Sequence, residues 1–449
     1  MSIFKACDIR GVYGTELTES LALRLGRVVG RHLQGQTVVV GGDVRLSTPA
    51  LKSALMEGLV AAGARVLDVG ILPTPALYFA KRKLGAYASV MVTASHNPAP
   101  DNGFKLMLGE RPASEELLLE IERELAGPEP LPAPVPGSLQ AVEILPQYEA
   151  FLAERFAPGG QLRLVLDCGN GCYSTVAPAV LTRLGYRVDP LFCEPDGRFP
   201  NRAPNPAVVQ NLKALCARVL EVGADLGLAF DGDGDRVIFV DETGAPAESD
   251  RVAVLIARQV LRAEPRSLGP GEVIYDIKSS SALAEAVQAA GGRPVMERSG
   301  HAFIKTALLE RNALMGAEIS GHFFFRELGG DDGLFAACLL FQIIQAEGKS
   351  LGQLLAEVPR YPITPDIRLR CTPAAVQAIL AELQAGFASF PISTLDGVRI
   401  DFGDGWALAR PSVTEPLITL RFEAHTAERL REIQSLVRGR APTLAEIWN

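Results

Sequence analysis

The chain has 449 residues, and its 44 Lys and Arg residues are outnumbered by 52 Asp and Glu residues, giving a formal net charge of −8. We do not expect such a chain to bind nucleic acid, because that binding needs a basic surface. An anionic ligand stays possible, since a local cleft can carry the opposite sign. Hydrophobic residues make up 48% and charged residues 21%, which is typical of globular proteins and excludes disordered or collagen-like chains. The length predicts about two to four domains.

Nothing in the sequence predicts secretion or insertion into a membrane. The first residues, MSIFKACDIRG, include charged and turn residues and lack the apolar stretch of a signal peptide. The longest apolar run, residues 334–341, is too short to span a bilayer. The 7 cysteines are scattered and odd in number, so we expect reduced thiols. We therefore expect a cytoplasmic protein without a membrane partner.

Three segments share one pattern: residues 37–70, 162–191 and 272–300. Each begins with a β-branched apolar run that ends at an aspartate, namely Asp43, Asp167 or Asp276. Each continues through a polar turn into a stretch of helical periodicity, and then reaches a glycine and a second short strand. Strand–helix–strand units of this kind build parallel sheets. The pattern predicts three related α/β domains in tandem, with parallel or mixed sheets.

The last ninety or so residues have a different pattern, which predicts a smaller α+β domain. Its expected strands are residues 366–370, 397–402, 406–410 and 417–423, and its expected helices are 373–387 and 427–437. Proline at every second position from 128 to 136 predicts an extended surface connection within the first domain. We place domains I, II, III and IV, arranged around one central cleft, at residues 1–146, 147–250, 251–361 and 362–449.

The segment DGDGDR, residues 231–236, lies between two apolar runs that we expect to be strands. Asp231, Asp233 and Asp235 alternate with glycines, whose backbone freedom lets three carboxylates converge on one hard cation such as Mg²⁺. Arg236 directly after them is typical of a site where metal and phosphate meet. One alternative is an EF-hand loop with Glu242 at its twelfth position, but the sixth position requires Gly and the flanks are not helical. The other alternative is a solvated acidic turn.

The segment TASHNP, residues 93–98, follows a predicted strand and continues through DNGFK to Lys105. Its turn residues place Ser95 and His96 on a loop beyond the strand end, where the sites of α/β proteins lie. A serine hydroxyl can act as a nucleophile, and a phosphorylated serine would supply a further oxygen to a metal. A hydrolase triad is an alternative, but no G-x-S-x-G elbow surrounds the serine. By itself, the segment is equally an ordinary turn.

Smaller loops add polar side chains of the types that bind phosphates and sugars. The residues are, in chain order, Arg10, Lys278, His301, Glu318, Ser320, His322, Arg410, Ser412 and Thr414. The acceptor, hydroxyl and imidazole groups of EISGH, residues 318–322, suit sugar hydroxyls. A guanidinium beside two hydroxyls in RPSVTEP, residues 410–416, is typical of a phosphate cradle. Taken singly, each of these residues also has an ordinary structural explanation.

Taken together and in order, the motifs resemble the α-D-phosphohexomutase superfamily over nearly the whole chain. That superfamily has a T-A-S-H-N-P serine loop, a D-G-D-G-D-R metal loop, a G-E-x-S-G-H sugar loop and an R-x-S-x-T-E-P phosphate loop. All four motifs occur in this chain, one in each expected domain. The opening D-I-R-G and the E-I-S-G-H form are most similar to the bacterial phosphomannomutase/phosphoglucomutase branch.

The resemblance implies an isomerase that interconverts hexose 1-phosphate and hexose 6-phosphate, with mannose or glucose as the sugar. Ser95 would carry a phosphoryl group, and one Mg²⁺ would be held by that group together with Asp231, Asp233 and Asp235. Transfer to the sugar would give a hexose 1,6-bisphosphate, and glucose 1,6-bisphosphate would serve as activator.

The resemblance also implies roles for the remaining motif residues. Arg10, His96, Lys105 and Arg236 would line the transferring phosphate, and Lys105 or His322 would move the proton. Glu318 and Ser320 would bind the sugar hydroxyls. The other phosphate would be held by Lys278, His301, Arg410, Ser412, the backbone of Val413 and Thr414.

Two positions depart from the superfamily pattern, and other functions stay open. Cys7 stands where members often have Tyr, and Val413 stands where Asn or Gly is usual, so affinity or sugar preference could differ. The alternatives are a phosphoglucosamine mutase, a metal-dependent phosphatase that uses the same serine, and a non-catalytic sensor of sugar phosphates. We expect small sugar phosphates as the only partners, and a monomer, with a dimer as the alternative.

Overall fold

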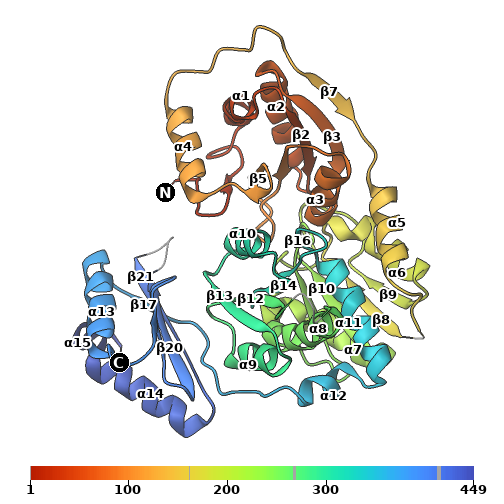
Figure 1. Ribbon diagram of the computed structural model, residues 1–449. Coiled ribbons are helices and arrows are strands. Elements are labelled where there is room, and N and C mark those ends of the chain that lie inside the picture. The colour runs from red at the N-terminus through yellow and green to blue at the C-terminus, as the bar shows by residue number, and fades with distance from the viewer. Residues whose placement is uncertain (1, 161, 266–268, 412–415, 449) are drawn as a thin grey trace.

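The computed structural model describes residues 2–160, 162–265, 269–411 and 416–448. The chain forms four sheets, and each belongs to one of the expected domains. Figure 1 shows the elements of domains I, II and III packed together, whereas domain IV, in blue at the lower left, is joined to them by one extended segment that follows α12 (Leu351–Ala356). Among the described residues, no helix is long and apolar enough to cross a membrane.

Domain I has a seven-stranded mixed sheet in the order β1-β5-β4-β2-β3-β7, with β6 on β5. The strands are β1 (Ile9–Val12), β2 (Thr37–Gly42), β3 (Arg65–Ile71), β4 (Ala88–Val92), β5 (Asp101–Leu108), β6 (Arg111–Pro112) and β7 (Ser138–Ala141). The helices are α1 (Glu19–Leu33), α2 (Thr48–Ala61), α3 (Thr74–Lys83) and α4 (Glu115–Ala126). Strands β2 and β4 are almost wholly buried and apolar, as strands with both faces covered must be.

Domain II has a four-stranded sheet in the order β11-β10-β8-β9. Its strands are β8 (Arg163–Asp167), β9 (Arg187–Leu191), β10 (Leu226–Phe230) and β11 (Val237–Val240). Its helices are α5 (Leu145–Arg155), η1 (Cys172–Thr175), α6 (Ala177–Arg183), η2 (Val209–Leu212) and α7 (Lys213–Val222).

Domain III has a five-stranded sheet in the order β13-β12-β14-β15-β16. Its strands are β12 (Glu272–Asp276), β13 (Arg293–Glu297), β14 (Met315–Ala317), β15 (Phe323–Phe325) and β16 (Gly330–Asp331). Its helices are α8 (Ser249–Ala263), α9 (Ser281–Ala289), α10 (His301–Arg311), α11 (Gly333–Glu347) and α12. Helix α11 is apolar on all sides and nearly all buried, so it lies inside a core that the first three domains share.

Domain IV has its own five-stranded sheet, in the order β17-β21-β20-β19-β18, and its own core. Its elements are β17 (Ile367–Arg370), α13 (Pro373–Gly386), β18 (Ile392–Ser393), β19 (Val398–Asp401), β20 (Gly405–Pro411), β21 (Leu417–Ala424), α14 (Ala427–Arg440) and α15 (Pro442–Ile447). A small apolar cluster joins it to domain III, where Ile277 packs with Trp406 and Leu408. The buried Glu423 carboxylate supports this contact by accepting hydrogen bonds from Trp406 Nε1 and from the Ser281 N–H, both at 2.8 Å.

The fold class expected from the sequence is confirmed. Each of the three repeated segments forms a parallel strand pair around a helix, namely β2 with β3, β8 with β9, and β12 with β13. Several elements were not predicted, among them β7, β18 and α15, which are short or exposed and carry little periodicity. The domain limits proposed after residues 146 and 250 fall in the first turns of α5 and α8.

Candidate active site

The Ser95 loop follows β4 at the carboxyl end of the domain I sheet. Ser95 has a left-handed backbone, with φ of 52°, and its side chain is fully buried. Its N–H donates to Thr93 Oγ1 at 2.8 Å, and Thr93 in turn donates to Asp43 Oδ2 at 2.7 Å. A non-glycine residue held in this conformation needs support from its surroundings, which is common where a side chain must be aimed at a site.

Arg45 supplies that support from the loop after β2. Its guanidinium donates to Asp43 at 3.0 Å and to four backbone carbonyl oxygens, those of Ser95, Asn97, Pro98 and Asp101, at 2.6–2.9 Å. The side chain is fully buried. One planar, charged fork therefore holds the whole Ser95 loop.

The Asp231 loop from domain II faces Ser95 directly. Ser95 Oγ donates to Asp231 Oδ2 at 2.8 Å, and the N–H groups of Gly234 and Arg236 donate to Asp231 Oδ1 at 3.0 and 3.2 Å. Gly234 has φ of 81°, which allows the backbone to turn around the carboxylate. Burial, followed by the nearby charges of Asp235 and Asp233, raises the pKa of Asp231 well above its usual value.

Asp233 and Asp235 bind the Lys105 ammonium, which reaches over from β5. Lys105 Nζ lies 2.7 Å from Asp233 Oδ2 and 2.5 Å from Asp235 Oδ2, and Thr74 Oγ1 donates to Asp233 Oδ2 at 2.7 Å. Although burial opposes the charge on Lys105, the two carboxylates raise its pKa well above the usual value. The ammonium is therefore a permanent hydrogen-bond donor here.

The three aspartates can hold a metal ion. One oxygen from each of Asp231, Asp233 and Asp235 lies within 4.8 Å of the others. Asp233 Oδ1 and Asp235 Oδ1 are buried and have no hydrogen-bond partner among the residues that the structure describes. Buried carboxylate oxygens need a partner, and Mg²⁺ prefers such ligands, so this donor set fits Mg²⁺.

His322 enters from domain III and completes the contact among three domains. Its Nε2 accepts a hydrogen bond from Arg236 Nε at 2.8 Å, and its Nδ1 lies 2.7 Å from Asp331 Oδ2. This arrangement places the proton on Nδ1 and leaves Nε2 as the basic nitrogen. The ring also lies near the metal loop, with Nδ1 3.7 Å from Asp235 Oδ1.

Lys305 is fully buried near Asp331, and sequence analysis did not select it. Its Nζ sits 3.0 Å from the centre of the Tyr78 ring and has no hydrogen-bond partner in the described part of the chain. Burial lowers the pKa of Lys305 to about 7, although the charge of Asp331 acts in the opposite direction. The amine therefore changes its charge near neutral pH.

Arg10 and His301 lie around Asp8, another buried residue that the sequence did not select. Arg10 Nε donates to Asp8 Oδ2 at 2.8 Å, and Arg10 Nη1 donates to Asn97 Oδ1 at 2.9 Å, next to the Ser95 loop. His301 Nε2 is 3.7 Å from Asp8 Oδ2. Burial favours the neutral carboxyl, but Arg10 and His301 still hold the pKa of Asp8 below its usual value. The ring centres of His301 and His322 are 5.9 Å apart, so this group adjoins the metal loop.

The candidate sugar-binding side chains have free polar atoms. Glu318 Oε2 and Ser320 Oγ are buried and have no hydrogen-bond partner among the described residues. Burial, and then the charge of Glu318, raises the pKa of Asp276 to about 6. Burial and then Asp8 raise the pKa of the Cys7 thiol to about 12, so the residue that replaces the usual Tyr is neutral.

The candidate residues for the second phosphate are not drawn together in the same way. Lys278 Nζ pairs with Asp366 Oδ2 at 3.0 Å, and Arg410 Nη2 pairs with Asp396 Oδ2 at 2.9 Å. Ser412, Val413 and Thr414 lie outside the described residues. The side chains that converge by direct contact are thus those of the serine loop, Lys105, the metal loop and His322.

His96 lies next to Ser95 in the serine loop. His96 Nδ1 is 3.2 Å from Ser95 Oγ, and burial, followed by the charges of Arg236 and Arg10, lowers the pKa of His96 well below its usual value.

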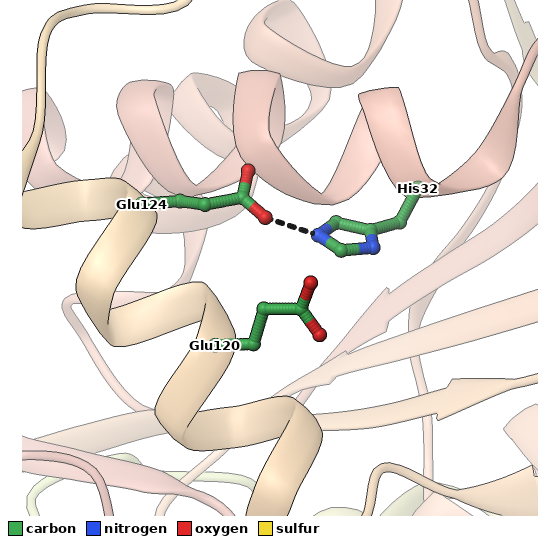
Figure 2. A group of neighbouring side chains, drawn as sticks. All are labelled: His32, Glu120 and Glu124. Carbon is green, nitrogen blue, oxygen red and sulfur yellow. Dashed lines mark hydrogen bonds and ion pairs between the residues drawn. The ribbon is translucent and has the colours of Figure 1, made fainter.

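Figure 2 shows a separate group on the surface of domain I, in which His32 Nε2 pairs with Glu124 Oε1 at 2.8 Å beside Glu120. The imidazole already has a partner there, and we assign this group no role.

The sequence matches all four domains described for the phosphoglucomutase/phosphomannomutase family. The matches are alpha/beta/alpha domain I over residues 1–130, alpha/beta/alpha domain II over 146–244, alpha/beta/alpha domain III over 248–361 and the C-terminal domain over 367–439. The chain belongs to this family, and the resemblance to the α-D-phosphohexomutases is confirmed.

Named relatives match over nearly their full length. A phosphomannomutase/phosphoglucomutase of Pseudomonas aeruginosa is 42% identical over 98% of this chain and 95% of its own. A probable phosphoglucosamine mutase of Methanopyrus kandleri is 38% identical over 96% of each chain. The crystal structure of a phosphoglucomutase/phosphomannomutase family protein of Burkholderia thailandensis superposes with a TM-score of 0.90 at 36% identity, covering 99% of this chain and 97% of its own.

The Arg45 clamp generates a first prediction. Arg45→Lys keeps the charge but loses the planar fork, so the Ser95 loop should shift and the turnover of hexose phosphate should fall by roughly 100-fold or more. Steady-state kinetics and circular dichroism check activity and fold together. The matched control is Arg111→Lys on β6, an exposed residue, which should keep wild-type activity. Equal activity in the two variants would contradict a positioning role for Arg45.

Lys305 generates a prediction on pH. In the unfolded chain its amine has an ordinary pKa near 10.4, so between about pH 7 and 10 the unfolded state binds a proton that the folded state does not. Wild-type stability should therefore rise with pH relative to Lys305→Met across that range. Thermal unfolding at pH 7, 8 and 9.5 measures the difference in Tm. The exposed Lys213→Met is the control and should show a constant difference; a constant difference for Lys305→Met also would refute the lowered pKa.

Proposed function

We propose that this protein is a phosphohexomutase that interconverts the 1-phosphate and the 6-phosphate of mannose, glucose or both. The observation that carries the proposal is the buried Ser95 hydroxyl, which lies 2.8 Å from Asp231 among three aspartates, a lysine and a histidine contributed by three domains. The name of the Pseudomonas relative supports the same activity.

The reaction uses phosphorylated Ser95 as the donor. A free hydroxyl oxygen of the bound sugar phosphate forms a bond to phosphorus, the bond from Ser95 Oγ to phosphorus breaks, and the sugar becomes a 1,6-bisphosphate. After the sugar turns around in the cleft, Ser95 attacks the other phosphorus and the product leaves as the isomeric monophosphate. Arg10 and Arg236 offset the negative charge of the transferring group.

Asp231, Asp233 and Asp235, together with the phosphoserine, would hold Mg²⁺. When bound, Mg²⁺ supplies charge neutralisation and Lewis acidity for phosphoryl oxygens. The Lys105 ammonium pairs with Oδ2 of Asp233 and of Asp235, so the Oδ1 atom of each of these carboxylates is left to bind a cation.

His322 is the better candidate for proton transfer. Lys105 is held charged by two carboxylates and can only donate, whereas His322 Nε2 carries a lone pair that accepts from Arg236. Once the sugar hydroxyl displaces the Arg236 N–H from Nε2, its proton would pass to that nitrogen, and Asp331 would stabilise the resulting imidazolium through its contact with Nδ1.

The second phosphate and the sugar would be bound by the remaining residues at the cleft. The phosphate-binding set is Lys278, His301, Arg410, Ser412, the Val413 backbone and Thr414, and Glu318 and Ser320 would bind sugar hydroxyls. Domain IV meets domain III at a small apolar cluster and at polar contacts such as Lys278–Asp366 and Ser281–Glu423, and we expect it to rotate there as a lid over the bound sugar. The domain limits at 146, 250 and 361, a cytoplasmic location and a monomeric state are parts of the same proposal.

A coupled assay tests the activity. Purified protein with Mg²⁺ and a trace of glucose 1,6-bisphosphate should convert glucose 1-phosphate or mannose 1-phosphate to the 6-phosphate. Release of inorganic phosphate at the same rate would establish a phosphatase instead. Glucosamine 1-phosphate belongs in the panel because a probable phosphoglucosamine mutase is among the relatives, and a preference for it would overturn the mannose or glucose assignment.

The role of Ser95 has a direct test. Ser95→Ala should reduce turnover by at least about 1000-fold while leaving the fold intact, because no other hydroxyl replaces the phosphoryl carrier. Ser89→Ala is a matched control, since Ser89 is also buried in domain I and its hydroxyl has no partner among the described residues. Phosphoprotein mass analysis should find the phosphoryl group in the control and not in Ser95→Ala. Normal turnover in the latter would remove Ser95 from the reaction.

The metal site predicts a dependence on divalent cations. Chelation with EDTA should abolish activity, and added Mg²⁺ should restore it. Asp233→Asn should raise the Mg²⁺ concentration needed for half-maximal activity by about tenfold or more, since it removes one anionic ligand. Glu120→Gln in the surface group of Figure 2 should leave that concentration unchanged. If the two variants respond alike, the three aspartates are not the functional metal site.

A further inference from the structure

Two cysteine side chains meet at the carboxyl end of the domain II sheet, away from any role in the proposed reaction. Cys168 directly follows β8, and Cys193 lies two residues beyond the end of β9. Their sulfur atoms are 3.1 Å apart, and both thiols are free. A disulfide needs about 2.05 Å, so the sulfurs have only about 1 Å to close.

The backbone around the pair directs the two thiols toward each other. Strands β8 and β9 are neighbouring parallel strands, and the Cys168 N–H donates to the Leu191 carbonyl oxygen at 3.1 Å. Phe192 then takes a left-handed conformation with φ of 54°, which turns the chain back toward β8. Cys193 Sγ consequently lies 3.3 Å from the Leu166 carbonyl oxygen as well as beside Cys168. A strained residue at this place holds a geometry that extended backbone would not give.

The two thiols differ in access and acidity. Cys168 is fully buried, whereas Cys193 is partly exposed. The hydrogen bond between the two thiols lowers the pKa of Cys193, whereas burial raises the pKa of Cys168 well above its usual range. An accessible thiol with a lowered pKa beside a buried partner is the arrangement of an attacking and a resolving cysteine.

We propose that Cys168 and Cys193 form a reversible intramolecular disulfide when the protein meets a small disulfide oxidant such as oxidised glutathione. The Cys193 thiolate attacks one sulfur of the oxidant, which forms a mixed disulfide and releases one glutathione thiolate. Cys168 then attacks Cys193 Sγ and its proton passes to the departing glutathione sulfur, which forms the protein disulfide and releases the second glutathione. Two protein thiols are oxidised and one glutathione disulfide is reduced to two thiols.

The disulfide would form next to residues that hold the metal loop in place. Asp167, next to Cys168, accepts from Arg202 Nε at 2.7 Å, and Arg202 Nη2 donates to the Phe230 carbonyl oxygen at 2.7 Å, directly before Asp231. A link between residues 168 and 193 restricts the unfolded chain without moving these contacts. We therefore expect the oxidised protein to unfold at a higher temperature, by on the order of 5 °C. This inference does not depend on the proposed mutase activity.

The test uses the full chain equilibrated in glutathione buffers of increasing oxidised fraction, followed by alkylation and tryptic digestion. Cleavage after arginine places Cys168 in peptide 164–183 and Cys193 in peptide 188–198, so the bond appears as one cross-linked pair. The pair should form in wild type, disappear on treatment with dithiothreitol and raise Tm. Peptide 164–183 also contains Cys172, and fragmentation of the pair must place the bond at Cys168.

Three variants make the test specific. Cys168→Ser should stop at a glutathione adduct on Cys193, because the resolving thiol is gone, and Cys193→Ser should give neither cross-link nor adduct on these peptides. Cys216→Ser, on α7, is the matched control and should cross-link as wild type does. The proposal fails if wild type gives no 168–193 bond in fully oxidised buffer, if the bond joins Cys172 instead, or if oxidation lowers Tm.

Discussion

The packing of the first three domains depends on three carboxylates that are buried at one point. Asp231, Asp233 and Asp235 are each at most 1% exposed, and buried negative charges are tolerated only when cations and donors surround them. These partners come from three domains. Domain I contributes the Lys105 ammonium, and domain II contributes backbone N–H groups of the metal loop. Domain III contributes His322, whose ring lies near Asp235. Domains I, II and III must therefore pack as one body, and their shared apolar core agrees with this requirement.

Much of the fold was readable from the sequence because local patterns dictated it. The apolar runs at residues 37–42, 163–167 and 272–276 have no alternation, as strands covered on both faces require, and glycine and polar turns mark where each helix begins and ends. The acidic loop and the serine loop were readable for the same reason, since each motif is contiguous. The sequence also indicated that these loops end strands, and the carboxyl ends of strands are where α/β sites gather.

The residues that sequence analysis missed act across long separations in the chain. Arg45 has no motif around it, and its role exists only because the loop of residues 95–101 folds over its guanidinium. Lys305 stands in a helix whose apolar residues follow no clear stripe, and Asp331 in a strand of two residues, so neither carries a local signal. A search for charged residues at otherwise apolar positions could have selected Lys305, but its neighbour Tyr78 lies more than 200 residues away in the chain.

Both tryptophans of the chain, Trp406 and Trp448, lie in the C-terminal domain. Trp406 is buried against Ile277 of domain III, and its indole N–H donates to Glu423 of its own domain. Trp448 stacks on Phe422 in the core of the C-terminal domain. The protein thus carries an intrinsic optical reporter that is restricted to one domain. A change at the contact with domain III would alter the emission of one indole and leave the other as an internal reference.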